Sequence, residues 1–465
     1  MKEKLNYLIE KYRDRIIEKT QEIIRIRSVI EEPMAGKPFG EGIDKALKFC
    51  LNLGEEEGLN SLNIDGFAGF LEVGQGEKMA GILCHVDVVP EGTGWSFPPY
   101  NGDIHKGKLF GRGSIDNKGP AIASLFALKA IKESGLPVQK RGRLILGTDE
   151  ESGAKCIQHY LKKEEPPICG FSPDAEFPGI FAEKGIIRFK MIQKFSKEKE
   201  GDLILKNITG GTRANVVPEF AECNFEIGQN GLPKAKEMVE NFPNTKGIEC
   251  LIRGNHLIIK SQGTSAHASL PEEGENAIGK LFKILAKIDF SPRDAFNFVS
   301  FLSEKIGIET NGDSLGIKIS DEVSGKLTLN LGVADFDENM GQVQLDIRYP
   351  VSFYEDKIMG IIRKQTSKRK ILIADKKHKA PVYVDKESKL IKTLQSVYSE
   401  MTGEDATFKA IGGGTYCRYL DNTVAFGPVF PGQKELAHQK DEFISIEDLI
   451  LITKIYAQAL YLLIK

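Results

Sequence analysis

Long apolar runs are missing from this 465-residue sequence. No stretch approaches the roughly 18 consecutive apolar residues that a membrane-spanning helix requires. Residues 1–27 alternate charged and apolar residues at helical spacing, so they predict a helix, and they lack the continuous apolar core of a signal peptide. We therefore expect a soluble protein that has no membrane partner.

Cysteine is scarce, with seven residues that are scattered along the chain and never form a C-x-x-C pair. An odd, dispersed set offers neither a disulfide framework nor a zinc site made of thiolates. The pattern is typical of reduced thiols, and it predicts a cytoplasmic protein.

The sequence also lacks an excess of either basic or acidic residues. The 63 Lys and Arg residues nearly balance 65 Asp and Glu residues, which leaves a formal net charge of −2. This balance provides no basic footprint for nucleic acid and no polybasic segment for an acidic membrane surface. We expect neither nucleic acid nor membrane as a partner.

What the chain does have is length and two kinds of pattern. Its 465 residues predict two to three domains with sizeable cores. Strands alternate with helices in residues 1–184 and 381–465, as expected for an α/β domain with a mostly parallel sheet and flanking helices. Residues 185–380 are dominated by strands of alternating hydrophobicity, which indicate an inserted α+β domain. Its repeated order of strands and helix leaves two subdomains as an alternative.

Residues that could bind metals or transfer protons occur where the predicted strands of the α/β domain end. The segment Met79–Pro90 opens with a short apolar run and then presents His85 and Asp87 two residues apart. If both residues belong to the strand, their side chains point to the same face. An imidazole beside a carboxylate is poorly explained by packing, and it is typical of a site at the carboxyl end of a sheet.

Further carboxylates and a second histidine follow the later strands. Taken singly, Asp116 could cap a helix and His438 could be a structural histidine. Together, two imidazoles and three carboxylates can form two neighbouring metal sites if one carboxylate bridges them, and such ligands suit catalytic zinc, cobalt or manganese. Glu150 can supply the extra carboxylate that deprotonates a water on the metals. The candidates are His85, Asp116, Glu150, Glu151, Asp174 and His438.

Five segments, in order, resemble the co-catalytic zinc peptidase family, which includes carboxypeptidase G-type enzymes, peptidase T, succinyl-diaminopimelate desuccinylase and aminoacylases. In its length and large insert the chain is most similar to the dipeptidase V branch. The resemblance implies a catalytic α/β domain with an inserted lid domain. The segments are His85-Val-Asp-Val-Val-Pro90, Gly111-Arg-Gly-Ser-Ile-Asp-Asn-Lys-Gly119, Thr148-Asp-Glu-Glu-Ser-Gly153, Ser172-Pro-Asp-Ala175 and Leu436-Ala-His438.

The resemblance also implies a role for each of these residues. Asp87 would hydrogen-bond His85 and fix its tautomer. Glu150 would be the general base and later the proton donor to the leaving amine. A cis peptide bond would follow the bridging aspartate. Two zinc ions would be bound by His85 and Asp174 at one site, Glu151 and His438 at the other, and Asp116 between them.

Segments of the insert match the family as well: Thr212–Pro218, Gly263–Ala268 and Asp346–Tyr349. The match implies that His267 polarises the scissile carbonyl and that Asn215 and Arg348 bind the substrate. By the same match, Gly413 lies near the substrate; no Gly-Lys-Ser/Thr follows it, so its glycine run is not a P-loop. From the residues alone, Arg348 could equally be a solvated strand residue and His267 a loop cap.

We therefore predict a monomeric di-zinc dipeptidase that hydrolyses dipeptides with a free N-terminus. A metal-bridging water deprotonated by Glu150 would attack the peptide, and closure of the lid would bring its residues over the metals. The long insert would stand in for the partner subunit of smaller relatives. Alternatives are an N-acyl-amino-acid deacylase or a β-Ala-His dipeptidase. A non-catalytic binding protein is disfavoured, because both glutamates and both metal histidines are present.

Overall fold

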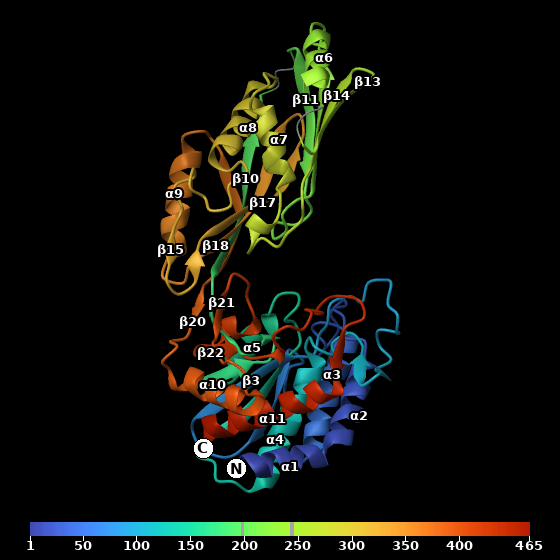
Figure 1. The fold of residues 1–465 in the computed structure, drawn as a ribbon, viewed down its shortest axis with the longest axis vertical. Coiled ribbons are helices and arrows are strands. Elements are labelled where there is room, and N and C mark those ends of the chain that lie inside the picture. Colours follow the sequence, from blue (N-terminus) through green and yellow to red (C-terminus); the bar gives the residue numbers. More distant parts are fainter. Residues whose placement is uncertain (197–199, 242–245) are drawn as a thin grey trace. The chain divides into compact units, whose positions relative to one another are not determined.

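The chain has a mixed α/β fold, and its computed structural model describes residues 1–196, 200–241 and 246–465. It divides into two compact units. The outer unit contains Met1–Phe181, Tyr383–Lys409 and Gly414–Lys465, and the inserted unit contains Ala182–Val382 and Ala410–Gly413. Figure 1 shows that the outer unit combines the blue N-terminal and the red C-terminal ends of the chain. Among the described residues, no helix is both long and apolar enough to cross a bilayer.

The outer unit is built on a mixed sheet. The strands of this sheet are β1 (Asn60–Ile64), β2 (Ala68–Val73), β3 (Met79–His85), β6 (Arg141–Gly147), β7 (Cys169–Ser172), β9 (Ile180–Glu183), β20 (Val382–Tyr383), β21 (Lys409–Ile411) and β22 (Thr423–Ala425), of which β9, β20 and β21 also include residues assigned to the inserted unit. They follow the order β1-β2-β6-β3-β7-β22-β9-β20, with β21 beside β9. The central strands β6, β3, β7 and β22 run parallel, whereas β1 and β2 are antiparallel to their neighbours. The predicted parallel pairing is thus found at the centre of the sheet.

Short strands complete the loops around this sheet. They are β4 (Asp103–His105) and β5 (Lys108–Phe110), which join β24 (Phe443–Ser445), and β8 (Ala175–Glu176), which pairs with β23 (Pro428–Val429). The β24–β5 pairing holds the segment after His438 against the loop that precedes Gly111. Residues more than 300 positions apart in the chain therefore meet at one side of the outer unit.

Helices flank the outer sheet: α1 (Lys2–Lys11), α2 (Arg13–Ile24), α3 (Glu41–Glu56), α4 (Lys118–Ser134), α5 (Lys155–Lys163), α10 (Lys389–Thr402), α11 (Ile446–Ile464) and the 3-10 turn η2 (Tyr416–Tyr419). The mostly apolar helices α4 and α11 are buried along most of their length and pack against each other and against β3 and β6. Ser445 caps α11 by accepting a hydrogen bond from the Asp448 amide. Gly135 ends α4 in the left-handed conformation, which glycine adopts without steric cost.

The predicted opening helix is two helices, α1 and α2, that meet at Tyr12. The Tyr12 amide reaches both the Leu8 and the Ile9 carbonyl, so the backbone tightens there. Its buried ring packs on Phe126 of α4, with the ring centroids 6.1 Å apart. A periodic pattern alone does not reveal this break, because the apolar spacing continues across it.

The inserted unit contains one continuous antiparallel sheet in the order β13-β14-β12-β11-β17-β18-β10-β19. Its two halves join through the pairing of β11 with β17. The strands are β10 (Gly185–Lys194), β11 (Leu203–Gly210), β12 (Phe220–Ile227), β13 (Ile248–Arg253), β14 (His256–Gln262), β17 (Thr328–Phe336), β18 (Met340–Tyr349) and β19 (Leu372–Lys379), with the separate pair β15 (Ser320–Asp321) and β16 (Gly325–Lys326). The helices are α6 (Leu232–Asn241), α7 (Ala277–Leu285), α8 (Arg293–Lys305), α9 (Glu355–Ser367) and the 3-10 turn η1 (Pro271–Glu273).

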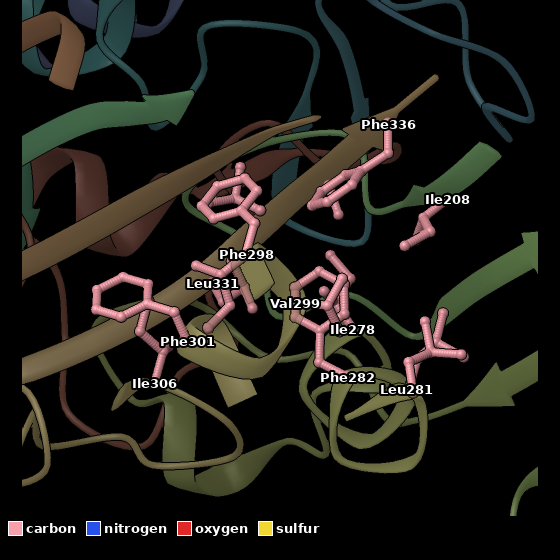
Figure 2. Close-up of a cluster of buried hydrophobic side chains, with 14 of the residues drawn as sticks. Ile208, Ile278, Leu281, Phe282, Phe298, Val299, Phe301, Ile306, Leu331 and Phe336 are labelled. Carbon is pink, nitrogen blue, oxygen red and sulfur yellow. The ribbon is translucent and has the colours of Figure 1, made fainter. Parts of the chain in front are cut away.

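One face of this sheet forms the core of the inserted unit. Helix α7 contacts strands of both halves of the sheet, and α8 contacts β10 and β18. Figure 2 shows Phe298 and Phe336 near Ile278 in the apolar cluster. The Phe298 and Phe336 rings stack with centroids 5.5 Å apart. Along β10, Phe189 belongs to this core, whereas Arg188 and Lys190 alternate with it and face the other way. The second face of the sheet is therefore polar.

Candidate metal centre

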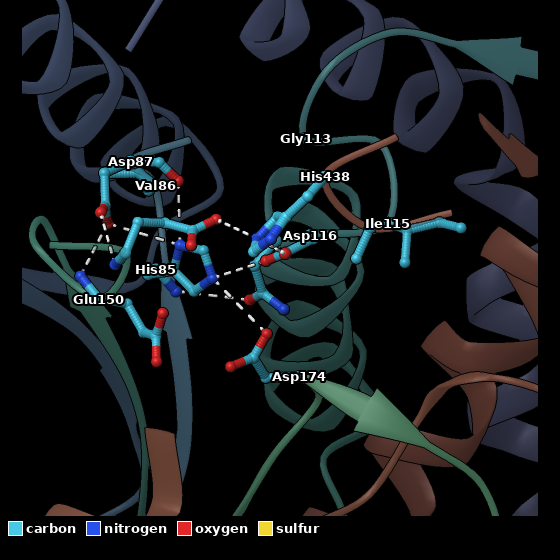
Figure 3. Close-up of polar contacts among 12 residues, drawn as sticks. His85, Val86, Asp87, Gly113, Ile115, Asp116, Glu150, Asp174 and His438 are labelled. Carbon is cyan, nitrogen blue, oxygen red and sulfur yellow. Dashed lines mark hydrogen bonds and ion pairs between the residues drawn. The ribbon is translucent and has the colours of Figure 1, made fainter. Parts of the chain in front are cut away.

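Three parallel strands deliver acidic residues or histidine to one edge of the outer sheet. Strand β3 is fully buried and ends at His85, β6 leads into Glu150 and Glu151, and β7 leads into Asp174. Because β3, β6 and β7 are parallel, their carboxyl ends lie at the same edge. Figure 3 shows His85 and Asp174 converging with Asp116 and His438, with Glu150 close by.

Asp116 lies between the two histidines. Its Oδ1 is 2.9 Å from His85 Nε2 and its Oδ2 is 3.1 Å from His438 Nε2. The loop that carries it leads directly into α4, and the peptide bond between Asp116 and Asn117 is cis, as the family resemblance implied. Each oxygen of this carboxylate thus faces a different imidazole, which is the arrangement required of a bridging ligand.

Two ligand sets share this aspartate. His85 Nε2 is 3.6 Å from Asp174 Oδ1, and His438 Nε2 is 3.0 Å from Glu151 Oε1. Within each set, His85–Asp116–Asp174 or Asp116–Glu151–His438, the ligand atoms lie within 4.8 Å of one another. Ligands about 2 Å from a common zinc ion have separations of this order. The structure therefore brings together all five predicted metal ligands in two sets that fit a pair of divalent ions.

The tautomer of His85 supports this fit. Its Nδ1 is 2.9 Å from the backbone carbonyl of Asp87, which can only accept a hydrogen bond, so Nδ1 carries a proton. The Nε2 lone pair is then left for a metal ion on the side of the carboxylates. The ring itself is fully buried, which fixes its direction.

Asp87 differs from the prediction in its position and in its main partners. It lies two residues beyond the end of β3, so a shared strand face does not explain its proximity to His85. Its Oδ1 is 3.4 Å from His85 Nδ1, whereas the backbone carbonyl is closer. The carboxylate also accepts hydrogen bonds from the Glu150 and Glu151 amides, at 3.2 and 3.1 Å. Asp87 therefore connects the histidine to the two glutamates.

Glu150 lies beside the ligands without joining them. In the described part of the chain its carboxylate makes no hydrogen bond or ion pair. Burial, reinforced by the negative charge of Asp174, holds the pKa of Glu150 well above its usual range. A carboxylate of raised pKa with unoccupied oxygens is suited to proton transfer at neutral pH.

The pKa values of the neighbouring ionisable groups are shifted as well. Burial raises the pKa of Asp174 to about 6 and also raises the pKa of Glu151. Hydrogen bonds to Asp116 and Glu151 raise the pKa of His438 to about 10. Burial opposes the ionisation of Asp116, but hydrogen bonds from His438 and His85 hold its pKa below the usual range. Divalent ions would displace protons from this cluster as they bind.

The sequence analysis did not identify Glu442 and Arg112, which together support the loop of Asp116. Glu442 is fully buried, and its Oε1 accepts hydrogen bonds from the amides of Gly113, Ile115 and Asp116, at 3.1, 2.9 and 3.2 Å. Its Oε2 accepts a hydrogen bond from Arg112 Nη1 at 2.7 Å. Glu442 thus supports the loop that presents the bridging aspartate. The only sequence signals were its position four residues after His438 and the arginine within the Gly-Arg-Gly segment.

The predicted substrate-binding residues lie in the inserted unit. Arg348 is buried and bound to Asp346 through two of its nitrogens, and Arg348 Nη1 donates to the Gly412 carbonyl at 2.9 Å. Arg348 is therefore not a solvated strand residue, and it holds the backbone next to Gly413. The backbone carbonyl of Asn215 accepts a hydrogen bond from the Ala268 amide at 3.0 Å, which places Asn215 beside the loop of His267.

His267 has a defined tautomer as well. The Ser269 amide donates to His267 Nδ1 at 3.3 Å, so the proton of the neutral ring lies on Nε2. Burial lowers the pKa of His267, and the positive charge of Arg348 lowers it further. A neutral imidazole that carries its proton on Nε2 is a hydrogen-bond donor suited to a developing oxyanion.

Comparison with known proteins identifies relatives of similar length. A protein of Bacillus subtilis (strain 168) named "Putative dipeptidase YtjP" is 42% identical, over 99% of this chain and 100% of that protein. "Putative dipeptidase SSP1012" of Staphylococcus saprophyticus is 36% identical, over 97% and 98% of the two chains. Among solved structures, aminoacylhistidine dipeptidase from Vibrio alginolyticus matches with a TM-score of 0.59 at 15% identity, over 96% of each chain. Human carnosine dipeptidase 1 matches with a TM-score of 0.55 at 16% identity, over 99% of each chain.

The structural matches concern the fold, because their sequence identities are low. The sequence matches also support membership of a common family, because they extend over nearly the full chain at 36% to 42% identity. Residues 81–462 also match the family described as Peptidase family M20/M25/M40. The resemblance seen in the motifs is thereby confirmed, and the chain belongs to peptidase family M20/M25/M40.

Proposed function

We propose that this protein is a metal-dependent dipeptidase that acts on dipeptides with a free N-terminus. The observation that carries the proposal is the pair of ligand sets sharing Asp116, with the unpaired carboxylate of Glu150 beside them. The relatives named dipeptidases support the choice of substrate. Histidine and carboxylate ligands favour two zinc ions, with cobalt or manganese as substitutes.

Each outer residue has a role in this proposal. When bound, the metal ions would polarise the scissile carbonyl and acidify a nearby water molecule. Glu150 removes a proton from the attacking water and later delivers it to the leaving amine, so that water adds across the peptide C–N bond. Asp87 holds Glu150 and Glu151 in place through their amides, and its backbone carbonyl orients His85.

The inserted unit supplies the substrate contacts. His267 donates its Nε2–H to the carbonyl oxygen as negative charge develops there. Asn215 and Arg348 bind the C-terminal carboxylate of the dipeptide, and Gly413 lies next to the backbone that Arg348 holds. Because Asn215 and Arg348 hold the carboxylate end of the substrate, they limit its length. We also propose that the enzyme acts as a cytoplasmic monomer, which sedimentation equilibrium and cell fractionation would test.

A substrate panel tests the proposal directly. Metal-free protein is titrated with zinc, cobalt or manganese, and hydrolysis is measured for dipeptides, tripeptides, N-acetylated dipeptides and β-Ala-His. We expect cleavage of free-amine dipeptides that appears as about two ions bind per chain. Metal-restored cleavage of N-acetylated substrates alone would move the enzyme to the deacylases. Full cleavage without added metal would contradict the assigned chemistry.

A further inference from the structure

A polar hollow of about 650 Å³ lies over the second face of the inserted sheet, and its lining also includes the core residues Phe189 and Leu345. Strands β10, β18 and β19 and the loop that follows β11 contribute its walls. Basic side chains dominate the lining, and Asp375 is the one acidic residue among them. The lining includes Arg188, Lys190, Arg213, Asn215, Lys376 and Lys377.

Some of these positive charges are neutralised. Lys190 pairs with Asp375 at 2.7 Å, and Lys376 pairs with Glu355 at 2.5 Å. Arg188 pairs with Asp346 at 2.6 Å, but the same carboxylate also binds Arg348. The nearby carboxylates therefore neutralise only some of the basic residues that line the hollow.

Arg213 and Lys377 make no ion pair with any residue that the structure describes, although both line the hollow. Lys377 lies directly opposite Arg188 in the β10–β19 pairing, and two cations at such positions repel each other. A bound anion would relieve this repulsion. Two exposed cations could simply be solvated, but their convergence with Arg188 in one hollow favours an anionic ligand.

The hollow also includes Asn215, the residue proposed to bind the C-terminal carboxylate of the substrate. Asn215 is joined to the loop of His267 by the hydrogen bond from the Ala268 amide. A ligand that occupies the hollow beside Asn215 is therefore adjacent to the end of the dipeptide. The C-terminal residue's own side chain is the part of the substrate closest to that carboxylate.

We propose that Arg213 and Lys377 form a subsite for a side-chain carboxylate, so that the enzyme prefers dipeptides ending in aspartate or glutamate. The inference rests on the proposed dipeptidase function and specifies its substrate class. A dipeptide with a neutral side chain brings one carboxylate to the inserted unit, which Asn215 and Arg348 bind. An acidic C-terminal residue brings a second one, which pairs with Arg213 and Lys377, the two cations that have no carboxylate partner among the described residues.

Matched substrates isolate the charge from the shape. Ala-Glu and Ala-Gln, like Ala-Asp and Ala-Asn, differ in charge and hardly in size. We expect kcat/KM to favour Ala-Glu over Ala-Gln by about 10-fold at low salt, with the preference falling as ionic strength rises. In the double variant Arg213→Gln/Lys377→Gln the ratio should approach about 1, while cleavage of Ala-Gln stays within about 2-fold of the unmodified enzyme.

A control variant guards against a general charge effect. Arg253 is an exposed arginine on β13, at the opposite edge of the same sheet, and Arg253→Gln should keep the full preference for Ala-Glu. Equal cleavage of Ala-Glu and Ala-Gln by the unmodified enzyme would overturn the subsite and leave the dipeptidase function intact. A preference that survives in the double variant would also overturn it. Failure to cleave any dipeptide would overturn both proposals.

Discussion

The two units each place one aspartate between two basic residues, but with opposite consequences. In the outer unit Asp116 lies between His85 and His438, and in the inserted unit Asp346 binds Arg188 and Arg348. Imidazoles can lose their protons, so metal ions can replace those protons and turn the first arrangement into a cation site. Guanidinium groups stay charged at any physiological pH. The second arrangement therefore remains positive and can be satisfied only by anions.

The two units can therefore contribute different functions to the proposed reaction: metal binding in the outer unit and carboxylate binding in the inserted unit. The outer unit concentrates carboxylates around two candidate metal sites, where charge would develop during the proposed hydrolysis. The inserted unit concentrates cations, where a peptide carboxylate can be held. The choice of basic residue beside each aspartate, and not the aspartate itself, decides which charge the site accepts.

The largest effect is expected from a variant that removes proton transfer in the outer unit but keeps the metal ligands. The isosteric Glu150→Gln variant cannot accept a proton, so we expect kcat to fall by about 10²–10⁴-fold. Metal content, measured by elemental analysis, should remain that of the unmodified protein. The control Glu435→Gln removes an exposed carboxylate three residues before His438, and it should leave kcat unchanged. Wild-type kcat in Glu150→Gln would rule out the role assigned to this residue.

A second variant tests the aspartate of the inserted unit. Asp346→Ala removes the shared carboxylate and leaves Arg348 buried beside Arg188, so we expect a destabilisation of about 3–5 kcal/mol. Urea unfolding, with hydrogen exchange of the β10 and β18 peptides, would locate the loss in the inserted unit. The control Asp335→Ala alters an exposed aspartate on the neighbouring strand β17 and should change stability by less than about 0.5 kcal/mol. Equal stabilities of the two variants would show that Asp346 does not hold the arginines.

The sequence was most informative where parallel strands end. His85, Glu151 and Asp174 follow three neighbouring strands, and a common edge brings such residues together whatever the details of their loops. The pairing of Asp116 with both histidines came from family resemblance, because no local pattern relates residues 116 and 438. Ordered motifs of a known family therefore predicted more of the site than periodicity did.

The contacts that sequence reasoning missed link distant backbone segments. Asp87 binds the amides of Glu150 and Glu151, and any residue except proline would offer the same donors. The position of Lys377 opposite Arg188 depends on strand register, which changes with a single-residue shift. Similarly, the break at Tyr12 depends on packing against α4 and leaves the apolar spacing unchanged. Such features require the folded chain.

The smallest effect expected among these three variants concerns Glu442, the buried carboxylate that supports the loop of Asp116. Glu442→Ala removes the acceptor of three amides, so we expect metal affinity to fall by about 10–100-fold, the range found for groups that orient a ligand. Glu442→Gln keeps an oxygen that can accept the same amides, and it should lose much less. Affinity is measured by competition with a chelator, so the readout does not depend on turnover. If Glu442→Gln weakened binding as much as Glu442→Ala, the charge paired with Arg112 would be the decisive feature. The amide contacts would then be secondary, and the outer unit, like the inserted one, would depend on an arginine to hold its carboxylate.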